Sequence, residues 1–384
     1  MMRTERLFDI DAKASRFEAT VLAVSEEIGE YCTVLDKTLF FPEEGGQSCD
    51  TGMLGGARVL RVVEKQGVIY HYTDKALTVG DIVEGEIDYV ERYRKMQNHT
   101  GEHIVSGLIY KHFGLKNVGF HLSRDGMTAD FDGELTDENI KMIEELANRA
   151  VYECHPVRGY YPETSELAKL EYRSKLDLYE NVRIVEIEGI DMCACCAPHV
   201  SNTGEVGMIK ILEYPRYKGG VRISMKCGSD ALEGYRAEYE QIKRISMAIS
   251  AKRSEVADGV DRLIDEMGAL RGKISEMKRE LMEYRLEKIE YTDGNLCIFE
   301  DDGDMLALRN LVNAAKTRCG GICACFSGND TEGYKYIISS TSVDLKARSK
   351  EINAAIFGRG GGSSEMIQGS CTAKREEIEK YFKF

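Results

Sequence analysis

The first 90 residues alternate short apolar runs with glycine-containing turns. The runs cover about residues 17–24, 31–35, 57–63 and 68–72. Short runs of this kind, bounded by turn residues, are typical of half-buried β-strands. The pattern indicates a small barrel or sandwich, and we predict an N-terminal β-barrel domain over residues 1–90.

The pattern becomes helical beyond this segment. Apolar and histidine side chains recur at helix-compatible spacings from Met96 to Leu108, and a second helix is expected over about residues 136–151. Strand-like runs follow at 182–187 and 206–212. We therefore predict a mixed α+β domain over residues 91–228.

Residues 229–290 are charge-rich and carry one apolar seam, in which steps of four and three residues alternate. The seam consists of Val256, Val260, Leu263, Met267, Leu270, Ile274, Met277, Leu281 and Tyr284. This heptad spacing builds coiled coils. Gly259, Gly268 and Gly272 each weaken a helix by about 1 kcal/mol relative to alanine, so other contacts must support it. We expect a coiled coil that packs back as a helical hairpin or forms a homodimer.

Residues 291–384 alternate strand-like and helical runs, which predicts a small α/β domain. This domain contains the loop GRGGGSSEMIQG, from Gly358 to Gly369. Its glycines let backbone amides approach an anionic group such as phosphate, and a flexible turn is the alternative interpretation. Three nearby thiols are expected to be small buried residues on a strand rather than metal ligands. They are Cys319, Cys323 and Cys325.

The formal net charge of −14 argues against loose binding to nucleic acid, which depends on lysine and arginine. A nucleic-acid partner would need a local basic patch. The segment 214–226 offers Arg216, Lys218 and Arg222 with interleaved tyrosines and no acidic residue. The alternative is a solvated hairpin with Gly219 and Gly220 at its tip.

The opening segment is charged and lacks the apolar core of a signal peptide, and no run approaches the roughly 18 apolar residues that a membrane helix needs. We therefore expect a cytoplasmic protein with no membrane partner. The 12 cysteines are expected to be reduced thiols, with metal binding possible where they cluster.

A metal site is indicated by two pairs of residues. His99 and His103 lie four residues apart on a predicted helix, so both imidazoles project from one face. Cys195 and His199 form a second pair with the same spacing, although Cys193 and Cys196 compete for the thiolate role. Three imidazoles and one thiolate point to one Zn²⁺ per chain.

Two features of this site leave its role open. A zinc ion held by four protein ligands is usually structural, because catalytic zinc keeps a position for water. In addition, His99-Thr-Gly-Glu-His103 matches the His-x-x-Glu-His peptidase signature, in which Glu102 would be the general base. That peptidase class uses a glutamate as its third ligand and gives Cys195 and His199 no role.

With these residues in view, the chain resembles the editing domain of alanyl-tRNA synthetase and its free-standing AlaX-type relatives. The resemblance rests on four ordered segments, which are DKTLFFPEEGGQSCDTG, NHTGEHI, VGFHLSRDGMTADFD and CCAPHVSNTGEVGMIKI. The heptad stretch and the GRGGGSSEMIQG loop resemble the C-terminal extension of the long AlaX form. The chain departs from the family pattern at Phe41, Glu44 and residues 196–198, so the shape of the pocket floor is its own.

The resemblance implies a role for individual residues. His99, His103, Cys195 and His199 would bind zinc, and Thr38 and Gln47 would line the pocket for a serine side chain. Glu102 would assist as a base or support the ligands, with a solvated helix residue as the alternative. The basic segment and the glycine-rich loop would contact RNA, through Arg216, Lys218, Arg222, Arg359, Gly360, Gly361 and Gly362.

The implied function is trans-editing, the hydrolysis of Ser-tRNA(Ala) and possibly Gly-tRNA(Ala). No synthetase core is seen ahead of the predicted barrel, so we expect no aminoacylation. The C-terminal domain over 291–384 is expected to be DHH-associated and, with the coiled coil over 229–290, to support a homodimer. The alternatives are the zinc peptidase and a non-catalytic, zinc-stabilised tRNA-binding module.

Overall fold

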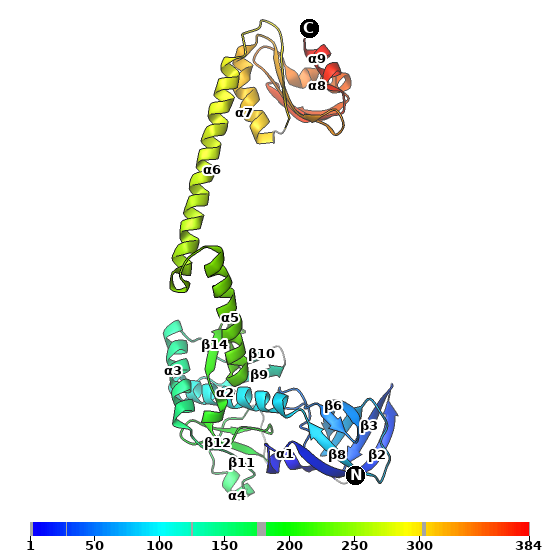
Figure 1. Cartoon of the computed structure of the whole chain (residues 1–384), viewed down its shortest axis with the longest axis vertical. Helices are drawn as coiled ribbons and strands as arrows, with labels where there is room; N and C mark the ends of the chain where they lie inside the picture. Colours follow the sequence, from blue (N-terminus) through cyan, green and yellow to red (C-terminus); the bar gives the residue numbers. More distant parts are fainter. Residues whose placement is uncertain (1–2, 28, 124–125, 175–181, 302–304, 384) are drawn as a thin grey trace. The chain divides into compact units, whose positions relative to one another are not determined.

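The computed structural model describes residues 3–27, 29–123, 126–174, 182–301 and 305–383. The chain forms two compact units, residues 1–248 and 249–384. Both units combine helices with sheets, which confirms the predicted mixed α+β, multidomain character (Figure 1). The four predicted domain ranges are finer than this division and stay predictions.

The first unit begins with a closed barrel of six strands. In barrel order these are β2 (Arg16–Glu27), β3 (Glu30–Leu35), β7 (Val68–Thr73), β6 (Ala57–Lys65), β5 (Gly52–Leu54) and β8 (Ile82–Ile87). Buried and exposed residues alternate strictly along β8, as its apolar-polar pattern requires. Three short elements complete this part: α1 (Leu7–Ile10) and the parallel pair of β1 (Glu5–Arg6) with β4 (Lys37–Thr38).

Next to the barrel lies a long buried helix, α2 (Tyr89–Phe113). The Asp88 carboxylate caps it by accepting a hydrogen bond from the Glu91 amide, and Gly114 ends it in the left-handed conformation (φ 70°). α2 and α3 (Asp137–Glu153) share an apolar core with a second sheet. That sheet has the order β14 (Ile209–Glu213), β16 (Gly220–Cys227), β10 (Gly126–Phe131) and β9 (Asn117–Ser123), with β15 (Arg216–Tyr217) paired to β16.

A three-stranded sheet approaches α2 closely at a glycine of the helix. It consists of β11 (Val157–Tyr160), β12 (Ile184–Ile187) and β13 (Asp191–Ala194), and the short helix α4 (Thr164–Leu167) precedes β12. A Cβ atom on Gly107 of α2 would lie 2.6 Å from the Asp191 Cβ and from the Ile190 carbonyl oxygen. Glycine at this position therefore lets β13 approach the helix closely.

Two helices follow the sheets. α5 (Gly228–Ala248) belongs to the first unit and α6 (Val256–Glu287) to the second. The predicted heptad seam lies on α6, and its residues from Leu263 to Tyr284 are between 46% and 67% exposed. A long helix therefore stands where the heptads predict one, and its pairing as a coiled coil stays a prediction.

The C-terminal sheet has the order β17 (Leu296–Glu300), β18 (Ile322–Asn329), β19 (Gly333–Ser340), β21 (Met366–Cys371) and β20 (Gly358–Gly362). Residues of α7 (Met305–Ala315) pack on one face, and residues of α8 (Leu345–Ala355) and α9 (Arg375–Phe382) pack on the other. Cys323 and Cys325 are fully buried on β18 and Cys319 is buried just before it, which confirms them as core residues.

The glycine-rich segment from Gly358 to Gly369 was wrongly predicted to be a loop. Its first five residues form the edge strand β20, which pairs with β21 in an antiparallel hairpin. Glycine spacing gives no sign of this pairing, because the hydrogen bonds come from a partner strand whose own register is set by β19. Arg359, Gly360, Gly361 and Gly362 therefore lie on an exposed sheet edge.

Candidate metal centre

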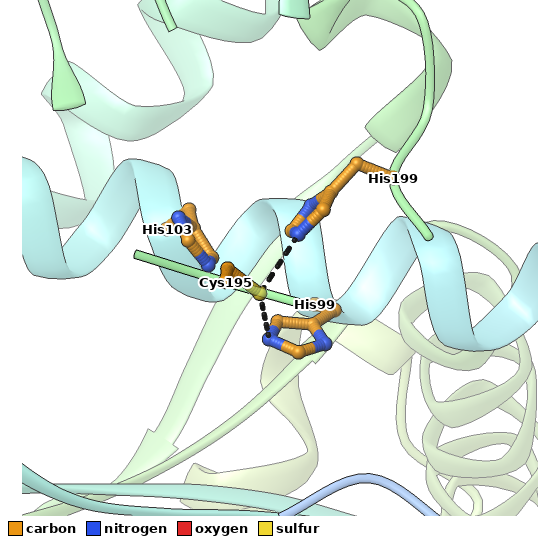
Figure 2. Close-up of side chains that lie close together, drawn as sticks. All are labelled: His99, His103, Cys195 and His199. Carbon is orange, nitrogen blue, oxygen red and sulfur yellow. Dashed lines mark hydrogen bonds between the residues drawn. The ribbon is translucent and has the colours of Figure 1, made fainter. Parts of the chain in front are cut away.

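The four predicted metal ligands meet in the first unit. His99 and His103 lie one turn apart on α2, Cys195 directly follows β13, and His199 lies four residues later (Figure 2). One donor atom from each residue lies within 4.8 Å of the others, so these four side chains could hold a metal ion. The close approach of β13 to α2 brings the two pairs together.

The distances fit a tetrahedral zinc site. The Cys195 Sγ atom lies 3.6 Å from the His99 Nε2 atom and 3.3 Å from the His199 Nε2 atom. Zn–S bonds of about 2.3 Å and Zn–N bonds of about 2.0 Å at a tetrahedral angle separate sulfur from nitrogen by about 3.5 Å. The chemistry of the donor set and its spacing therefore both suit Zn²⁺.

Each histidine is oriented through its other ring nitrogen. The His99 Nδ1 atom lies 2.9 Å from the Gln47 Oε1 atom. The His199 Nδ1 atom lies 3.0 Å from the Thr100 hydroxyl, and the His103 Nδ1 atom lies 2.9 Å from an Asp191 carboxylate oxygen. Partners of this kind fix the tautomer and direct Nε2 toward the centre.

The electrostatics favour a thiolate at Cys195. Burial alone would raise the pKa of this thiol. His99 and His199 lower the pKa by more than burial raises it, so the net pKa lies well below the usual value. Burial lowers the pKa of His199 to about 3, so this imidazole is neutral. At Asp191, burial is outweighed by His103 and Arg173, which lower the carboxyl pKa to about 2. A thiolate and a neutral imidazole are the forms that bind metal.

The two competing thiols have other neighbours. Burial raises the pKa of Cys193 to about 11, and its sulfur lies within 4.8 Å of donor atoms of Asp191 and His103. Burial and the neighbouring Cys195 raise the pKa of Cys196, whose thiol hydrogen bonds to Glu44. Both are therefore poorer thiolate donors than Cys195.

A cavity of about 560 Å³ opens on the centre, and His99, His103 and Cys195 contribute to its wall. Glu102 also lines it and is only 3% exposed, so the alternative of a solvated helix residue is wrong. The Glu102 carboxylate accepts hydrogen bonds from the Asn117 amide and the Ser106 hydroxyl. The helical pattern could not reveal this burial, because β9 supplies Asn117.

The predicted substrate pocket residues Thr38 and Gln47 are both fully buried. Neither is among the described residues that line the cavity. Gln47 instead contacts the metal centre through His99, and the Thr38 hydroxyl lies 2.9 Å from the His71 Nε2 atom. Their role in the serine pocket stays a prediction. The contacts that the structure shows hold neighbouring histidines in place.

His71 should make the stability of the fold sensitive to acid. Burial lowers the pKa of its imidazole to about 4, below the usual 6.5, so the folded state holds it neutral. Its stabilising contribution is complete above pH 6.5 and is lost as the pH falls toward 4. Between pH 7.5 and 5 we expect this residue to account for about 2 kcal/mol of the drop in the free energy of unfolding.

Urea denaturation of the wild type and of His71→Gln at both pH values measures this effect. The variant should lose about 2 kcal/mol less than the wild type over the same interval. All other ionisable residues are the same in both proteins, so the difference isolates His71. Equal losses in the two proteins would contradict the expectation.

Sequence reasoning missed the groups that support the ligands. Asp191 connects the ligand His103 to Arg173. Its carboxylate contacts His103 and accepts two hydrogen bonds from Arg173 at 2.7 and 2.8 Å. Arg183 donates to the carbonyl oxygens of Cys195 and Ala197 and so fixes the ligand loop. The local signal for one of these groups was the position of Thr100, which lies between His99 and His103 in the sequence.

The basic segment forms a hairpin, as the alternative interpretation expected, but its turn consists of Lys218 and Gly219 (φ 48° and 84°) rather than Gly219 and Gly220. The segment contains no acidic residue, but the fold places acidic residues from other parts of the chain next to it. Arg222 pairs with Asp130 of the neighbouring β10, and Arg216 pairs with Glu134. The fold therefore neutralises part of the charge that the segment carries.

Comparisons with known proteins show what this chain is similar to. The family model for the threonyl and alanyl tRNA synthetase second additional domain matches residues 182–263, which include Cys195 and His199. The model for class II (A) tRNA synthetases matches residues 9–91, the barrel region. The chain is 32% identical to an alanine–tRNA ligase of Natronomonas pharaonis over 90% of its length.

The chain is alanyl-tRNA synthetase-like. Alanine–tRNA ligases of Ignicoccus hospitalis and Pyrococcus furiosus, at 28% and 32% identity, each match 98% of it. The chain spans 39% of the Natronomonas ligase and 42% of the other two. The solved C-Ala domain of Aquifex aeolicus alanyl-tRNA synthetase matches 23% of the chain and 86% of that domain at 23% identity. Its TM-score of 0.21 does not establish a shared fold.

No helix among the described residues is both long enough and apolar enough to cross a membrane.

Proposed function

We propose that the chain binds one Zn²⁺ through His99, His103, Cys195 and His199. Support comes from the donor spacing and from the three hydrogen-bonded Nδ1 atoms, which leave each Nε2 atom for the centre. When bound, the ion would supply positive charge that orients or polarises a substrate group in the cavity.

We further propose that the chain hydrolyses the ester of Ser-tRNA(Ala), and possibly Gly-tRNA(Ala), in trans. The observation that carries this proposal is that three residues of the His₃Cys cluster lie in the wall of a 560 Å³ cavity, in a chain similar to alanine–tRNA ligases along 90% of its length. A deeply buried cluster without a cavity would instead favour a structural ion.

The residues of the cavity suit an ester hydrolase. Glu102 is held by Asn117 and Ser106 at the wall, where its carboxylate can accept a proton from an attacking water molecule. Gln47 orients His99, and Asp191 orients His103. The chain's own contribution is therefore to fix the ligands and to place one carboxylate beside the reacting ester.

The test is deacylation of Ser-tRNA(Ala), Gly-tRNA(Ala) and Ala-tRNA(Ala) by the purified zinc-loaded protein. We expect rapid loss of serine or glycine and sparing of alanine. Hydrolysis of none of the three would overturn the deacylase proposal, and equal hydrolysis of all three would overturn its editing specificity.

Two surfaces are proposed to contact tRNA(Ala). One is the hairpin with Arg216, Lys218 and Arg222, and the other is the exposed edge of β20 with Arg359. The residues of β20 from Arg359 to Gly362 are exposed, so a phosphate can reach their backbone. A homodimer through the apolar seam of α6 or the C-terminal domain, and a cytoplasmic location, complete the proposal.

Neighbouring glycines on β20 offer a sharp test of the second surface. A Cβ atom on Gly360 would lie 2.3 Å from the Tyr336 hydroxyl and from the Gln368 carbonyl oxygen, whereas one on Gly361 would meet no atom within 4 Å. The Gly361→Ala variant should therefore fold normally. It should bind tRNA about 10-fold more weakly, because the added methyl group would lie between the backbone and the phosphate. Gly360→Ala should lower the melting temperature instead.

Filter binding with tRNA(Ala) and thermal denaturation measure the two effects. Gly294 is a matched control, since a Cβ atom there would make only an ordinary contact with the Thr292 hydroxyl, 3.7 Å away. Unchanged tRNA affinity in Gly361→Ala would remove β20 from the proposed interface.

The main alternative is a zinc-stabilised tRNA-binding module without catalysis, because four protein ligands close most structural zinc sites. Zinc removal separates the two: a folded apoprotein without turnover favours catalysis, and global unfolding favours the structural role. The peptidase alternative is weaker, since Cys195 and His199 complete the cluster and that class gives them no role.

A further inference from the structure

One carboxylate in the cavity wall is not used by the metal centre. Glu44 lies at the start of a tight turn that ends at Gln47, and the two residues exchange backbone hydrogen bonds of 3.0 and 3.2 Å. Gly45 and Gly46 form the corner with φ values of 63° and 84°. The same turn thus presents Glu44 to the cavity at one end and Gln47 to His99 at the other.

Glu44 lies close to the ligand loop. Its carboxylate hydrogen bonds with the thiol of Cys196, which is the residue next to Cys195. The turn itself is close as well, since a Cβ atom on Gly45 would lie 3.4 Å from the Cys196 sulfur. Both Glu44 and Cys196 line the cavity, so this carboxylate lies beside the centre.

The charge of Glu44 is only partly compensated. Among the described residues, its Oε2 atom makes no hydrogen bond, and the Arg6 guanidinium is 3.6 Å away. Arg6 makes its close ion pair with Glu64. Two carboxylates thus share one guanidinium, and burial raises the pKa of Glu44 despite Arg6. A second cation at this position would be stabilised.

The other carboxylate of the wall is differently placed. Glu102 already accepts hydrogen bonds from Asn117 and Ser106 at one oxygen, and the Arg173 guanidinium interacts with its charge. Glu44 has a weak thiol donor and a guanidinium 3.6 Å away that it shares with Glu64. A cationic substrate group therefore gains more at Glu44, because its Oε2 atom accepts no hydrogen bond from the described residues and can accept a charge-assisted one.

We propose that Glu44 binds the α-ammonium group of the aminoacyl ester and so positions the ester beside the metal centre. This inference rests on the proposed deacylase function. The ammonium group is the cation that an aminoacyl-adenosine end carries, whereas its carbonyl and ring nitrogens are acceptors that a carboxylate repels. Glu44 is then a substrate-binding residue. The family pattern has glycine at this position, and glycine has no side chain that could make this contact.

The experiment compares substrates with and without the positive charge. Hydrolysis of Ser-tRNA(Ala) and of N-acetyl-Ser-tRNA(Ala) is measured for the wild type, Glu44→Gln and Glu43→Gln. Glu43 is the matched control, because it is exposed, adjacent, equally charged and absent from the described cavity lining. Binding of non-hydrolysable 3′-serylamino-3′-deoxyadenosine, free and N-acetylated, is measured by calorimetry on the same three proteins.

We expect Glu44→Gln to lose about 10- to 100-fold in kcat/KM for Ser-tRNA(Ala) and in affinity for the free amine, with little change for the acetylated compounds. Glu43→Gln should match the wild type. Equal behaviour of Glu44→Gln and wild type, or equal losses with both forms of the substrate, would overturn the ammonium contact.

The binding arm separates the two proposals. If the wild type hydrolyses no ester but prefers the free amine through Glu44, the deacylase proposal fails and the ammonium site stands. If the wild type hydrolyses Ser-tRNA(Ala) and Glu44→Gln does so equally well, the ammonium site fails and the deacylase proposal stands.

Discussion

Replacing Cys195 with alanine should abolish zinc binding and ester hydrolysis together. Loss of a residue that only orients a ligand typically costs 10- to 100-fold in metal affinity, so we expect loss of a ligand itself to cost more than about 100-fold. The three imidazoles would remain, but the thiolate that faces His99 and His199 would be gone. The zinc content after dialysis, measured with a chromogenic chelator, should fall close to zero.

The matched control is Cys154→Ala, which removes an exposed thiol that lies outside the cavity lining described above. Circular dichroism and urea denaturation of both variants show whether the fold persists. Cys195→Ala with full zinc content would show that another group completes the site. Full zinc loss with unchanged hydrolysis would leave the ion without a catalytic role.

Replacing Arg92 with alanine should be strongly destabilising. Its side chain is fully buried, and it pairs with the Asp50 carboxylate and donates to the carbonyl oxygen of Leu39. Removing one partner of a buried ion pair leaves the other charge uncompensated, at a cost of about 3 to 5 kcal/mol. Urea denaturation should show this loss in the free energy of unfolding.

The same substitution should also weaken zinc binding. Arg92 ties α2 to the segment that carries Glu44 and Gln47, because Asp50 also accepts a hydrogen bond from the Phe41 amide. Arg58→Ala is a suitable control, since this arginine is exposed on the barrel. A loss below about 1 kcal/mol in Arg92→Ala would mean that water or a rearranged side chain compensates Asp50.

The sequence predicted features whose cause is local. The i, i+4 spacing of His99 and His103 places both imidazoles on one side of α2 whatever else the chain does. The heptads from Val256 to Tyr284 predicted the long helix α6 for the same reason, since helical hydrogen bonds connect near neighbours. The chemistry of cysteine and histidine then indicated zinc before any contact was known.

The tertiary structure decided what depends on distant partners. The burial of Glu102 follows from Asn117 on β9, the pairing of β20 follows from β21, and the neutralisation of Arg222 follows from Asp130 on β10. None of these partners is marked by local spacing, because strand pairing and side-chain contacts join residues far apart in the chain.

The metal centre combines both kinds of information. The sequence by itself determined the four ligand types and the two pairs in which they occur. Only the fold decided that a glycine at position 107 lets β13 approach α2, that Gln47 and Asp191 orient the imidazoles, and that Glu44 faces the same cavity. The physical reason is that ligand chemistry belongs to each side chain, whereas its orientation is set by the packing of elements that the chain brings together only on folding.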